Sequence, residues 1–275
     1  MLIAQLTDPH VRPPGRLAYG IADTNALLRQ AVDAVLAFAP RPDLVLVTGD
    51  LTDVGAVEEY RALRAQLDRL PMPVYVIPGN HDLRDSLRAA FAEQPWMHQH
   101  ARFIQYAIDS WPIRLLALDT VVPGNAHGEL CTDRLAWLEA RLAEVPDQPT
   151  LIMMHHPPFV TGIDHMDAIN CANGEALGSI IRRHGNIERI ICGHHHRPIQ
   201  IRWQGTLVSV APSIGHQVTL DMRPGAAASF TMEPPAFHLH YWIPGTGLVT
   251  HQAYIGTYPG PYPFVPDPDY PGQQP

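Results

Sequence analysis

Five short motifs in this chain carry histidine, aspartate and asparagine side chains, which are common metal ligands in proteins. Each motif directly follows a short apolar run of the kind that forms a buried β-strand. In chain order the motifs are Asp8-Pro9-His10, Gly49-Asp50-Leu51-Thr52-Asp53, Gly79-Asn80-His81-Asp82, His155-His156-Pro157-Pro158 and Gly193-His194-His195-His196. Together they predict a site for two metal ions, assembled along one edge of a sheet.

The spacing within the motifs indicates which side chains can share an ion. Asp8 and His10 lie two residues apart, so in an extended segment both point to the same side. The same spacing separates His194 from His196. Asp50 follows the end of a strand, and its two carboxylate oxygens can bridge two cations. These residues can therefore supply most of a two-metal site.

Asn80 and His155 add an amide oxygen and an imidazole, and imidazole suits Zn, Fe and Co. Each feature alone also has an ordinary structural explanation. Asp8-Pro9 is typical of a turn, Gly49-Asp50 of a strand that becomes a loop, and a single histidine of a hydrogen-bonded core residue. Because these explanations would have to hold at all five motifs, the shared metal site is favoured. Asp53 either holds its turn or orients a ligand from behind.

The elements that must position these motifs alternate along the chain. Apolar runs predict strands over residues 2–6, 44–48, 74–77, 115–118, 151–154 and 189–192. Helical spacing predicts four helices between them, beginning at Asp23 or Thr24, near Tyr60, at Thr132 and at Asn173. This alternation is typical of a layered α/β fold. Residues 103–108 and 113–118 read as a hairpin, so we expect mixed sheets.

The composition narrows the possible classes of protein. A chain of 275 residues with 46% hydrophobic and 17% charged residues fits one globular domain, or one domain with an appendage. A net charge of −8 gives no Lys/Arg surplus for binding a nucleic-acid polymer. The 3 cysteines are too few for a disulfide framework, which fits a reducing compartment. Without a long apolar run or a signal-peptide pattern, we expect a cytoplasmic protein with no membrane partner.

In this order, the five motifs match the D-x-H, G-D-x-x-D, G-N-H-D/E, H and G-H-x-H signature. The chain therefore resembles the calcineurin-like metallophosphoesterases over residues 1–216, which implies a four-layer αββα sandwich of mixed sheets. Val54 stands where the Ser/Thr protein phosphatases have an arginine, and this difference, together with Asp82, argues against protein phosphatase activity. The chain looks most similar to the class III cyclic nucleotide phosphodiesterases, in particular their bacterial glycerophosphodiesterase branch. The segments that carry this finer resemblance are Tyr19-Gly20, residues 153–158, residues 166–171 and residues 215–218.

The resemblance implies the ligands of two ions, which would be Fe, Zn, Mn or Co. For the first ion it implies Asp8, His10, Asp50 and His196. For the second it implies Asp50, Asn80, His155 and His194, with Asp50 bridging. The choice of His155 over His156 rests on the family pattern alone. His195, between two ligands, should point away and be a solvated or supporting residue.

Two cations roughly 3.5–4 Å apart suit in-line displacement at phosphorus, because they acidify a shared water and neutralise phosphoryl oxygens. Two such ions suit attack of a metal-bound hydroxide, and the resemblance to the phosphodiesterases implies a small phosphodiester as substrate, with Asn80 and His81 as catalytic residues. His81 would bind a substrate oxygen or protonate the leaving group. Substrate contacts are expected from Asn80, His81, His196 and His216. Residues 164–170 either line the pocket or form an irregular surface loop.

The substrate stays open among 3′,5′-cyclic AMP, other cyclic nucleotides such as 2′,3′-cyclic nucleotides, and glycerophosphodiesters. All of these present a diester to the same site. The alternative functions are a phosphomonoesterase of the same fold and a metal-dependent nucleotide sensor without turnover.

The residue pattern changes after about Pro212, where helical spacing stops. Residues 237–243 and 248–254 read as a hairpin, and 7 prolines in the last 18 residues favour an extended arm. The apolar residues of this region need a partner surface. We therefore expect a catalytic domain over residues 1–216. Over residues 217–275 we expect a strand-rich cap and dimerisation region with a Pro-rich tail, whose hairpin pairs across subunits of a homodimer or larger homo-oligomer.

Overall fold

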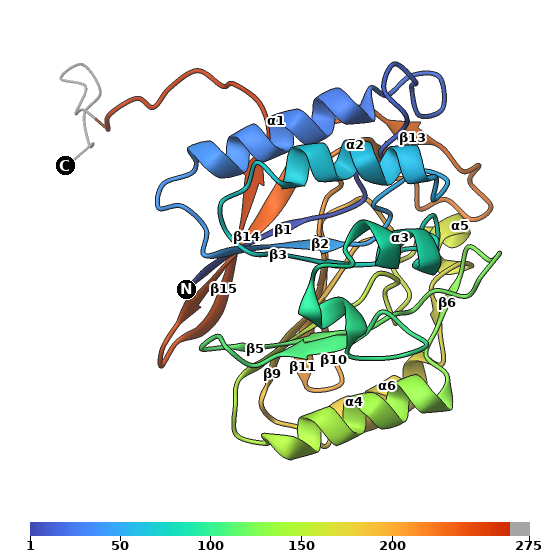
Figure 1. Ribbon diagram of the computed structural model, residues 1–275, viewed down its shortest axis with the longest axis vertical. Helices are drawn as coiled ribbons and strands as arrows, with labels where there is room; N and C mark the ends of the chain where they lie inside the picture. The colour runs from blue at the N-terminus through green and yellow to red at the C-terminus, as the bar shows by residue number, and fades with distance from the viewer. Residues whose placement is uncertain (265–275) are drawn as a thin grey trace.

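Two mixed β-sheets lie face to face at the centre of the molecule, and helices cover both outer faces (Figure 1). The structure is a computed structural model and describes residues 1–264. The order of layers is helices, sheet, sheet, helices, which is the four-layer αββα arrangement that the resemblance implied. None of the described helices is long and apolar enough to cross a membrane.

The first sheet has five strands in the order β15-β14-β1-β2-β3. Its strands are β1 (Leu2–Leu6), β2 (Leu44–Thr48), β3 (Val74–Ile77), β14 (Ala236–Ile243) and β15 (Gly247–Tyr254). β1, β2 and β3 are parallel, and every residue of β1 and β2 is buried. That burial explains why their sequences read as continuous apolar runs instead of alternating ones.

Helices α1 (Thr24–Ala37), α2 (Val57–Leu67) and α3 (Arg84–Ala90) lie outside the first sheet. Leu28 and Val32 repeat at helical spacing on α1 and are buried in the core under the sheet. The helix begins where expected, because the Asp23 side chain accepts a hydrogen bond from the backbone N–H of Ala26 at 3.0 Å. The positions of α1 and α2, which sequence spacing predicted, are thus confirmed, whereas α3 was not predicted.

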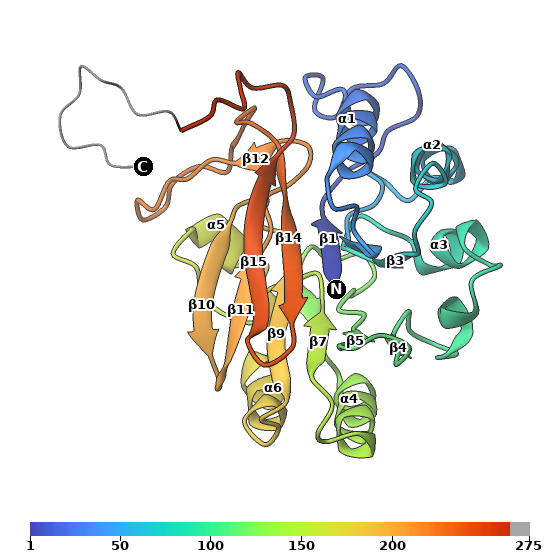
Figure 2. The ribbon, with the colours of Figure 1, turned by 90° about the vertical axis from the view of Figure 1, so that its left-hand side faces the viewer.

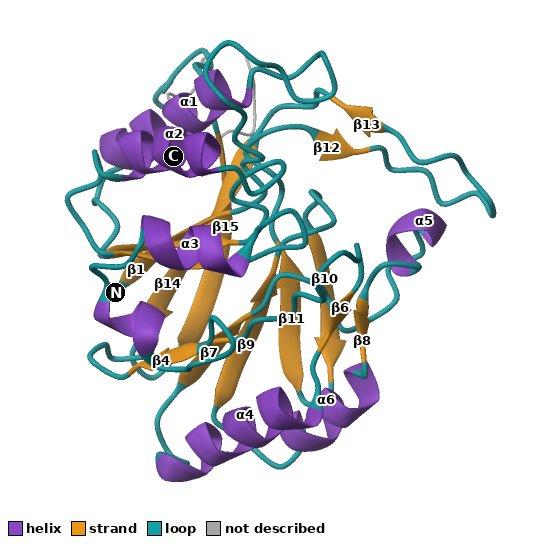
Figure 3. Ribbon diagram, turned by 45° about the vertical axis from the view of Figure 1, so that its right-hand side comes forward, coloured by secondary structure: helices purple, strands orange, loops and turns teal. Residues whose placement is uncertain are grey.

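The second sheet has six strands in the order β10-β11-β9-β7-β5-β4. Its strands are β4 (Tyr106–Ile108), β5 (Arg114–Ala117), β7 (Thr150–Met153), β9 (Ile187–Cys192), β10 (Ile199–Trp203) and β11 (Thr206–Val210). The expected hairpin is confirmed as the antiparallel pair β4–β5. Helices α4 (Thr132–Glu144) and α6 (Gly174–Ile181) cover the outer face of this sheet and bury a second core (Figure 3).

Several short elements lie in the loops around the sheets. They are the 3₁₀-helix Pro95–His98, β6 (Gly128–Glu129), α5 (Asp164–Asp167), β8 (Cys171–Ala172), β12 (Gln217–Val218) and β13 (Phe230–Thr231). β12 and β13 form a two-stranded antiparallel pair, and β6 and β8 form a parallel one. Both pairs are separate from the two central sheets.

The C-terminal hairpin is confirmed as β14–β15, but its partner differs from the expected one (Figure 2). β14 pairs antiparallel with β1 of the same chain, so the hairpin does not need another subunit for its partner surface, and its pairing across subunits stays a prediction. Phe237 and Leu239 belong to the core under the first sheet, which gives the hairpin its partner surface within the chain. The division at residue 216 and the homo-oligomer stay predictions.

The C-terminal arm was expected to be extended. Its residues 258–264 form neither helix nor strand. The remainder of the arm, residues 265–275, lies outside the described part of the chain.

Candidate metal centre

The five motifs come together because each follows the carboxyl end of a parallel strand, namely β1, β2, β3, β7 or β9. Ligand sites in α/β folds commonly form in the crevice at these strand ends. Asp8 Oδ1 lies 3.3 Å from His196 Nε2, although the two residues are far apart in sequence. Asp50 Oδ2 lies 3.5 Å from His10 Nε2 and 3.4 Å from His155 Nε2. Asp50 is therefore central to the cluster.

Four candidate ligands form one compact group. Single ligand atoms of Asp8, His10, Asp50 and His196 all lie within 4.8 Å of one another, and the four residues are buried. These are the residues that the family resemblance implied for the first metal ion. The group therefore has the size and the mixture of nitrogen and oxygen donors that a transition-metal ion requires.

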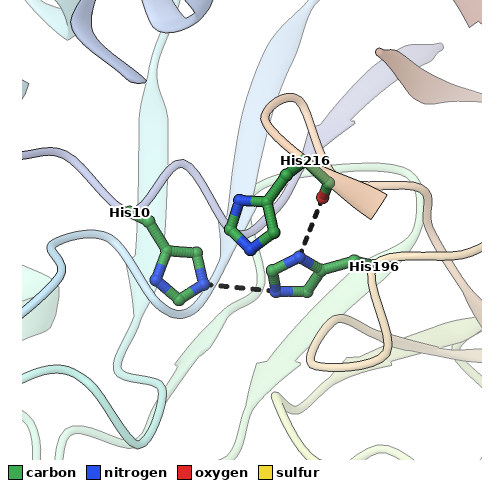
Figure 4. Close-up of side chains that lie close together, drawn as sticks. All are labelled: His10, His196 and His216. Atoms are coloured by element: carbon green, nitrogen blue, oxygen red, sulfur yellow. Dashed lines mark hydrogen bonds between the residues drawn. The ribbon is translucent and has the colours of Figure 1, made fainter. Parts of the chain in front are cut away.

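The ring nitrogens of His10 and His196 face each other across this group (Figure 4). Their Nε2 atoms are 3.2 Å apart. The Nδ1–H of His196 donates to the backbone oxygen of His216 at 2.9 Å, which in the neutral ring leaves a lone pair on Nε2. A cation between the two rings would satisfy both nitrogens.

The remaining candidate ligands carry atoms that no protein group satisfies. Asn80 Oδ1, His155 Nε2 and His194 Nε2 are buried and make no hydrogen bond within the described part of the chain. Burial of an unpartnered polar atom costs about 1–3 kcal/mol, and a bound cation would offset that cost for all three atoms. The set of donors therefore fits a second ion.

His155 and His156 differ in the state of their ring nitrogens. His155 Nδ1 donates to the backbone oxygen of Thr48 at 2.8 Å, which directs its free Nε2 toward Asp50. Both ring nitrogens of His156 are engaged, with Thr120 Oγ1 at 2.7 Å and the backbone oxygen of Ala126 at 3.1 Å. Of these two histidines, only His155 has a ring nitrogen left for a metal ion.

The backbone of the site is held in an uncommon conformation. Five candidate ligands have positive φ, namely Asp8 at 51°, His10 at 43°, Asp50 at 46°, His194 at 72° and His196 at 50°. Few residues other than glycine adopt such angles, and strain of this kind clusters at functional sites. The backbone of these loops is therefore strained, and this conformation directs the candidate ligands toward one another.

Two glycines allow these loops to approach closely. A Cβ atom at Gly49, where φ is +95°, would lie 2.3 Å from His155 Nδ1. A Cβ atom at Gly79 would lie 2.2 Å from Asp50 Oδ1. Any other residue would therefore displace a candidate ligand at these positions.

Asp82 has a role that the sequence did not reveal. Its buried carboxylate accepts hydrogen bonds from the backbone N–H of Leu51 at 3.0 Å and of Gly79 at 2.9 Å, and from the hydroxyl of Tyr60 at 2.8 Å. Burial, followed by the charge of Asp50, raises the pKa of Asp82 to about 6. Asp82 therefore ties the loop after β2 to the loop after β3. Leu51 and Tyr60 lie too far from Asp82 in sequence for its position to identify them as partners.

Asp53 lies behind the candidate ligands. Its Oδ1 is 3.4 Å from His10 Nδ1, and its backbone oxygen accepts a hydrogen bond from His81 Nδ1 at 2.7 Å. Arg12 Nη1 lies 3.0 Å from Asp53 Oδ2 and 3.2 Å from the buried Glu59 carboxylate. The geometry favours the orienting role for Asp53. The contribution of Arg12 and Glu59 was not expected, because neither belongs to a motif.

A cavity of about 450 Å³ opens above the cluster. Its floor consists of candidate ligands and their neighbours, namely His10, Asp50, Asn80, His81, His194 and His196. Its outer wall contains Tyr19, His165, Met166, Ile169, His216, Val218 and Phe230, together with Ala126, Ala228 and Ser229. All four residues expected to contact substrate thus line this cavity. Of the two alternatives for residues 164–170, pocket lining is confirmed.

His195 takes a different position from the histidines on either side. Its ring is fully buried, so it is not solvated, and it does not line the cavity. Its Nε2 lies 2.6 Å from Asn170 Oδ1. His195 therefore belongs to the supporting structure behind the cavity wall.

Comparison with known proteins agrees with this geometry. The family model described as calcineurin-like phosphoesterase matches residues 1–198. The chain is 40% identical to a probable glycerophosphodiester phosphodiesterase, GpdQ, of Arcobacter nitrofigilis, over 96% of this chain and 97% of that protein. It is 28% identical to the 3′,5′-cyclic adenosine monophosphate phosphodiesterase CpdA of Escherichia coli, over 77% of this chain and 75% of that one.

Among solved structures, a dimetal phosphatase from Danio rerio matches with a TM-score of 0.66 at 17% identity. The match covers 93% of this chain and 99% of that one. At this identity the likeness shows the fold alone. The family model covers more than half of the chain, and the first relative matches nearly its whole length. The chain belongs to the calcineurin-like phosphoesterase family and is a hydrolase of that family.

Proposed function

We propose that this chain is a dinuclear-metal phosphodiesterase that hydrolyses small phosphodiesters. The observation that carries the proposal is the set of three unpartnered buried atoms, Asn80 Oδ1, His155 Nε2 and His194 Nε2. They accompany the four-residue group around Asp50 at the floor of an open cavity. Such a floor is suited to holding metal ions in contact with a substrate.

The two proposed ions share Asp50. Asp8, His10, Asp50 and His196 would hold the first ion, and Asp50, Asn80, His155 and His194 the second. Fe, Zn, Mn and Co all suit this mixture of imidazole and oxygen donors. When bound, the ions supply positive charge for the phosphoryl oxygens and lower the pKa of a water molecule at the site.

His81 and His216 would handle the substrate. The backbone N–H of His81 donates to Asp50 Oδ1 at 2.9 Å, and its Nδ1 contacts the backbone oxygen of Asp53 at 2.7 Å. His81 Nε2 is therefore the ring nitrogen left for the cavity, where it can bind a substrate oxygen or give a proton to the leaving group. The His216 ring packs 4.7 Å from that of His196 and lines the same cavity, so it is suited to contact the ester group.

The cavity lining favours a diester over a monoester. Among the described residues that line it, none is Lys or Arg, and much of the outer wall is apolar. A phosphodiester carries one negative charge at neutral pH and a phosphomonoester close to two, so the monoester would require more positive charge. The wall also offers surface for a second organic group, which a monoester lacks.

The names of the relatives point to two classes of diester substrate. The relatives at 40% and 35% identity are named a probable glycerophosphodiester phosphodiesterase and a glycerophosphodiester phosphodiesterase, whereas a probable cyclic nucleotide phosphodiesterase of Rhodopseudomonas palustris is 34% identical. We propose glycerophosphodiesters as the first candidate and cyclic nucleotides as the second. We also propose that residues 217–275 act as a cap, that the chain forms a homo-oligomer, and that it is cytoplasmic.

The test is a substrate panel on protein loaded separately with Mn, Co or Zn/Fe. Each diester is paired with the monoester of the same leaving group, and kcat/KM is measured for both. We expect the diester to be preferred across several leaving groups. A consistent preference for monoesters would favour a phosphatase. Tight metal binding with no turnover of any ester would favour a non-catalytic sensor.

A further inference from the structure

The segment of residues 161–170 forms the α5 side of the cavity wall and is held in shape by one carboxylate. Asp167 accepts hydrogen bonds from the backbone N–H and the hydroxyl of Thr161, both at 2.8 Å, and from the backbone N–H of Gly162 at 2.7 Å. The side-chain amide of Asn170 donates to the same carboxylate at 3.0 Å. The segment is thus a closed loop of defined shape.

The buried His195 side chain connects this loop, through Asn170, to the loop that carries the candidate ligands His194 and His196. The amide nitrogen of Asn170 also donates to the backbone oxygen of Phe159 at 2.8 Å, so its Oδ1 is an acceptor. His195 Nε2 lies 2.6 Å from that oxygen and therefore donates to it. His195 stands between His194 and His196 in the chain. Its hydrogen bond to Asn170 therefore joins the loop of residues 193–196, here called the metal-ligand loop, directly to the wall.

The wall has little other support from the cores of the molecule. Ile163, Met166 and Val218 form a small apolar cluster of their own, with Ile169 packed against it, separate from the two large cores. A cluster of this size buries little apolar surface. Directional hydrogen bonds must therefore fix where the wall lies.

The candidate ligands have anchors of their own. The backbone N–H of His194 lies 3.1 Å from each carboxylate oxygen of Asp8, and His196 Nδ1 donates to the backbone oxygen of His216. Loss of the contact between His195 and Asn170 would leave these bonds intact. Its effect should therefore fall on the wall.

We propose that His195 and Asn170 are positioning residues that hold the cavity wall against the metal-ligand loop and thereby set selectivity for the organic groups of the substrate. The inference rests on the proposed phosphodiesterase function. Met166 and Ile169 of this wall line the cavity, and the aromatic ring of Phe230 lines it as well. The selected class is therefore diesters with an apolar or aromatic second ester group.

The test compares phenyl 4-nitrophenyl phosphate with methyl 4-nitrophenyl phosphate, which share a leaving group and differ in the second organic group. In N170A and H195A we expect kcat/KM for the phenyl diester to fall about 10-fold, mainly through KM, and for the methyl diester about 2-fold. H195Q keeps a side-chain donor and should recover part of the phenyl preference. Metal affinity, measured by competition with a chelator, should match that of the wild type in all three variants.

N186A is the matched control, because the Asn186 amide anchors a loop at the opposite end of the sheet by donating to the backbone oxygen of Gln148 at 2.7 Å. It should lower the melting temperature without changing the ratio of the two kcat/KM values. Equal losses for both diesters, or weakened metal binding in N170A and H195A, would overturn the proposal. If N170A does not fold, H195A removes the same hydrogen bond from its other end. A wild type that hydrolyses neither diester would overturn the proposed function itself, whereas unchanged ratios in an active enzyme overturn only this inference.

Discussion

The floor and the outer wall of the cavity differ in the elements that hold them in place. The floor consists of side chains that follow the ends of buried parallel strands, and much of its backbone is held in the left-handed region. The wall comes from short elements, α5 and the β12–β13 pair, that lie outside both central sheets (Figure 3). The comparison suggests a division of labour, in which a rigid floor holds the metal ions and a lightly packed wall selects the substrate.

The largest effect should follow removal of the residue that both proposed ions share. D50A removes an oxygen ligand from each ion, and we expect turnover to fall below a few per cent of wild type. The fold should persist, which circular dichroism can check. A variant that keeps both ions tightly bound and substantial activity would show that the floor is not the metal site.

A smaller effect is expected from His81, a floor residue whose backbone N–H donates to Asp50 and whose ring lines the cavity. H81A should retain both metal ions but lower kcat about 10²–10⁴-fold if the residue is a general acid. The loss should be smaller for nitrophenyl esters, because a good leaving group needs no proton. Equal losses for good and poor leaving groups would leave His81 with a binding role only.

The supports behind the floor should have a more modest effect. D53N weakens the contact with His10 Nδ1, and R12A removes the guanidinium that holds Asp53. Loss of such an outer partner commonly costs about 10–100-fold in metal affinity. We expect both variants to bind metal more weakly, as chelator competition can measure. R64A is a suitable control, because Arg64 pairs with Asp68 and Glu93 on the surface. Metal affinity in R12A that matches R64A would argue against this support.

The smallest effect is expected on the wall. F230A removes an aromatic ring that packs 5.1 Å from the His216 ring at the cavity. It should raise KM for aromatic diesters by about 3–10-fold and leave kcat and metal content near the wild-type values. A large loss of metal from F230A would mean that wall and floor are one cooperative unit, and the comparison would fail.

The same division explains what the sequence could predict. β1, β2 and β3 were predicted to the residue, because strands buried on both faces leave a continuous apolar run. The candidate floor residues followed from motifs of local spacing at those strand ends. Their roles as ligands stay predictions, although the structure brings them together.

Most of the contacts that support the floor and hold the wall in place could not be predicted, because they join distant segments without periodicity. Asp82 meets the loop after β2 through backbone N–H groups, which carry no sequence signal. His195 looks from its sequence like a spare histidine between two ligands, and only the fold brings it to Asn170. The hairpin of β14 and β15 was correctly predicted, but local pattern could not reveal that β1 of the same chain is its neighbour.

The central claim is that two metal ions bind at the floor, and neighbouring histidines offer the most direct test. Metal content per chain should be measured for the wild type, H155A and H156A after loading and removal of loosely bound metal. Because His155, unlike His156, has a free ring nitrogen directed toward Asp50, we predict two ions in the wild type, two in H156A and about one in H155A. One ion or fewer in the wild type, or equal metal content in the two folded variants, would contradict the account.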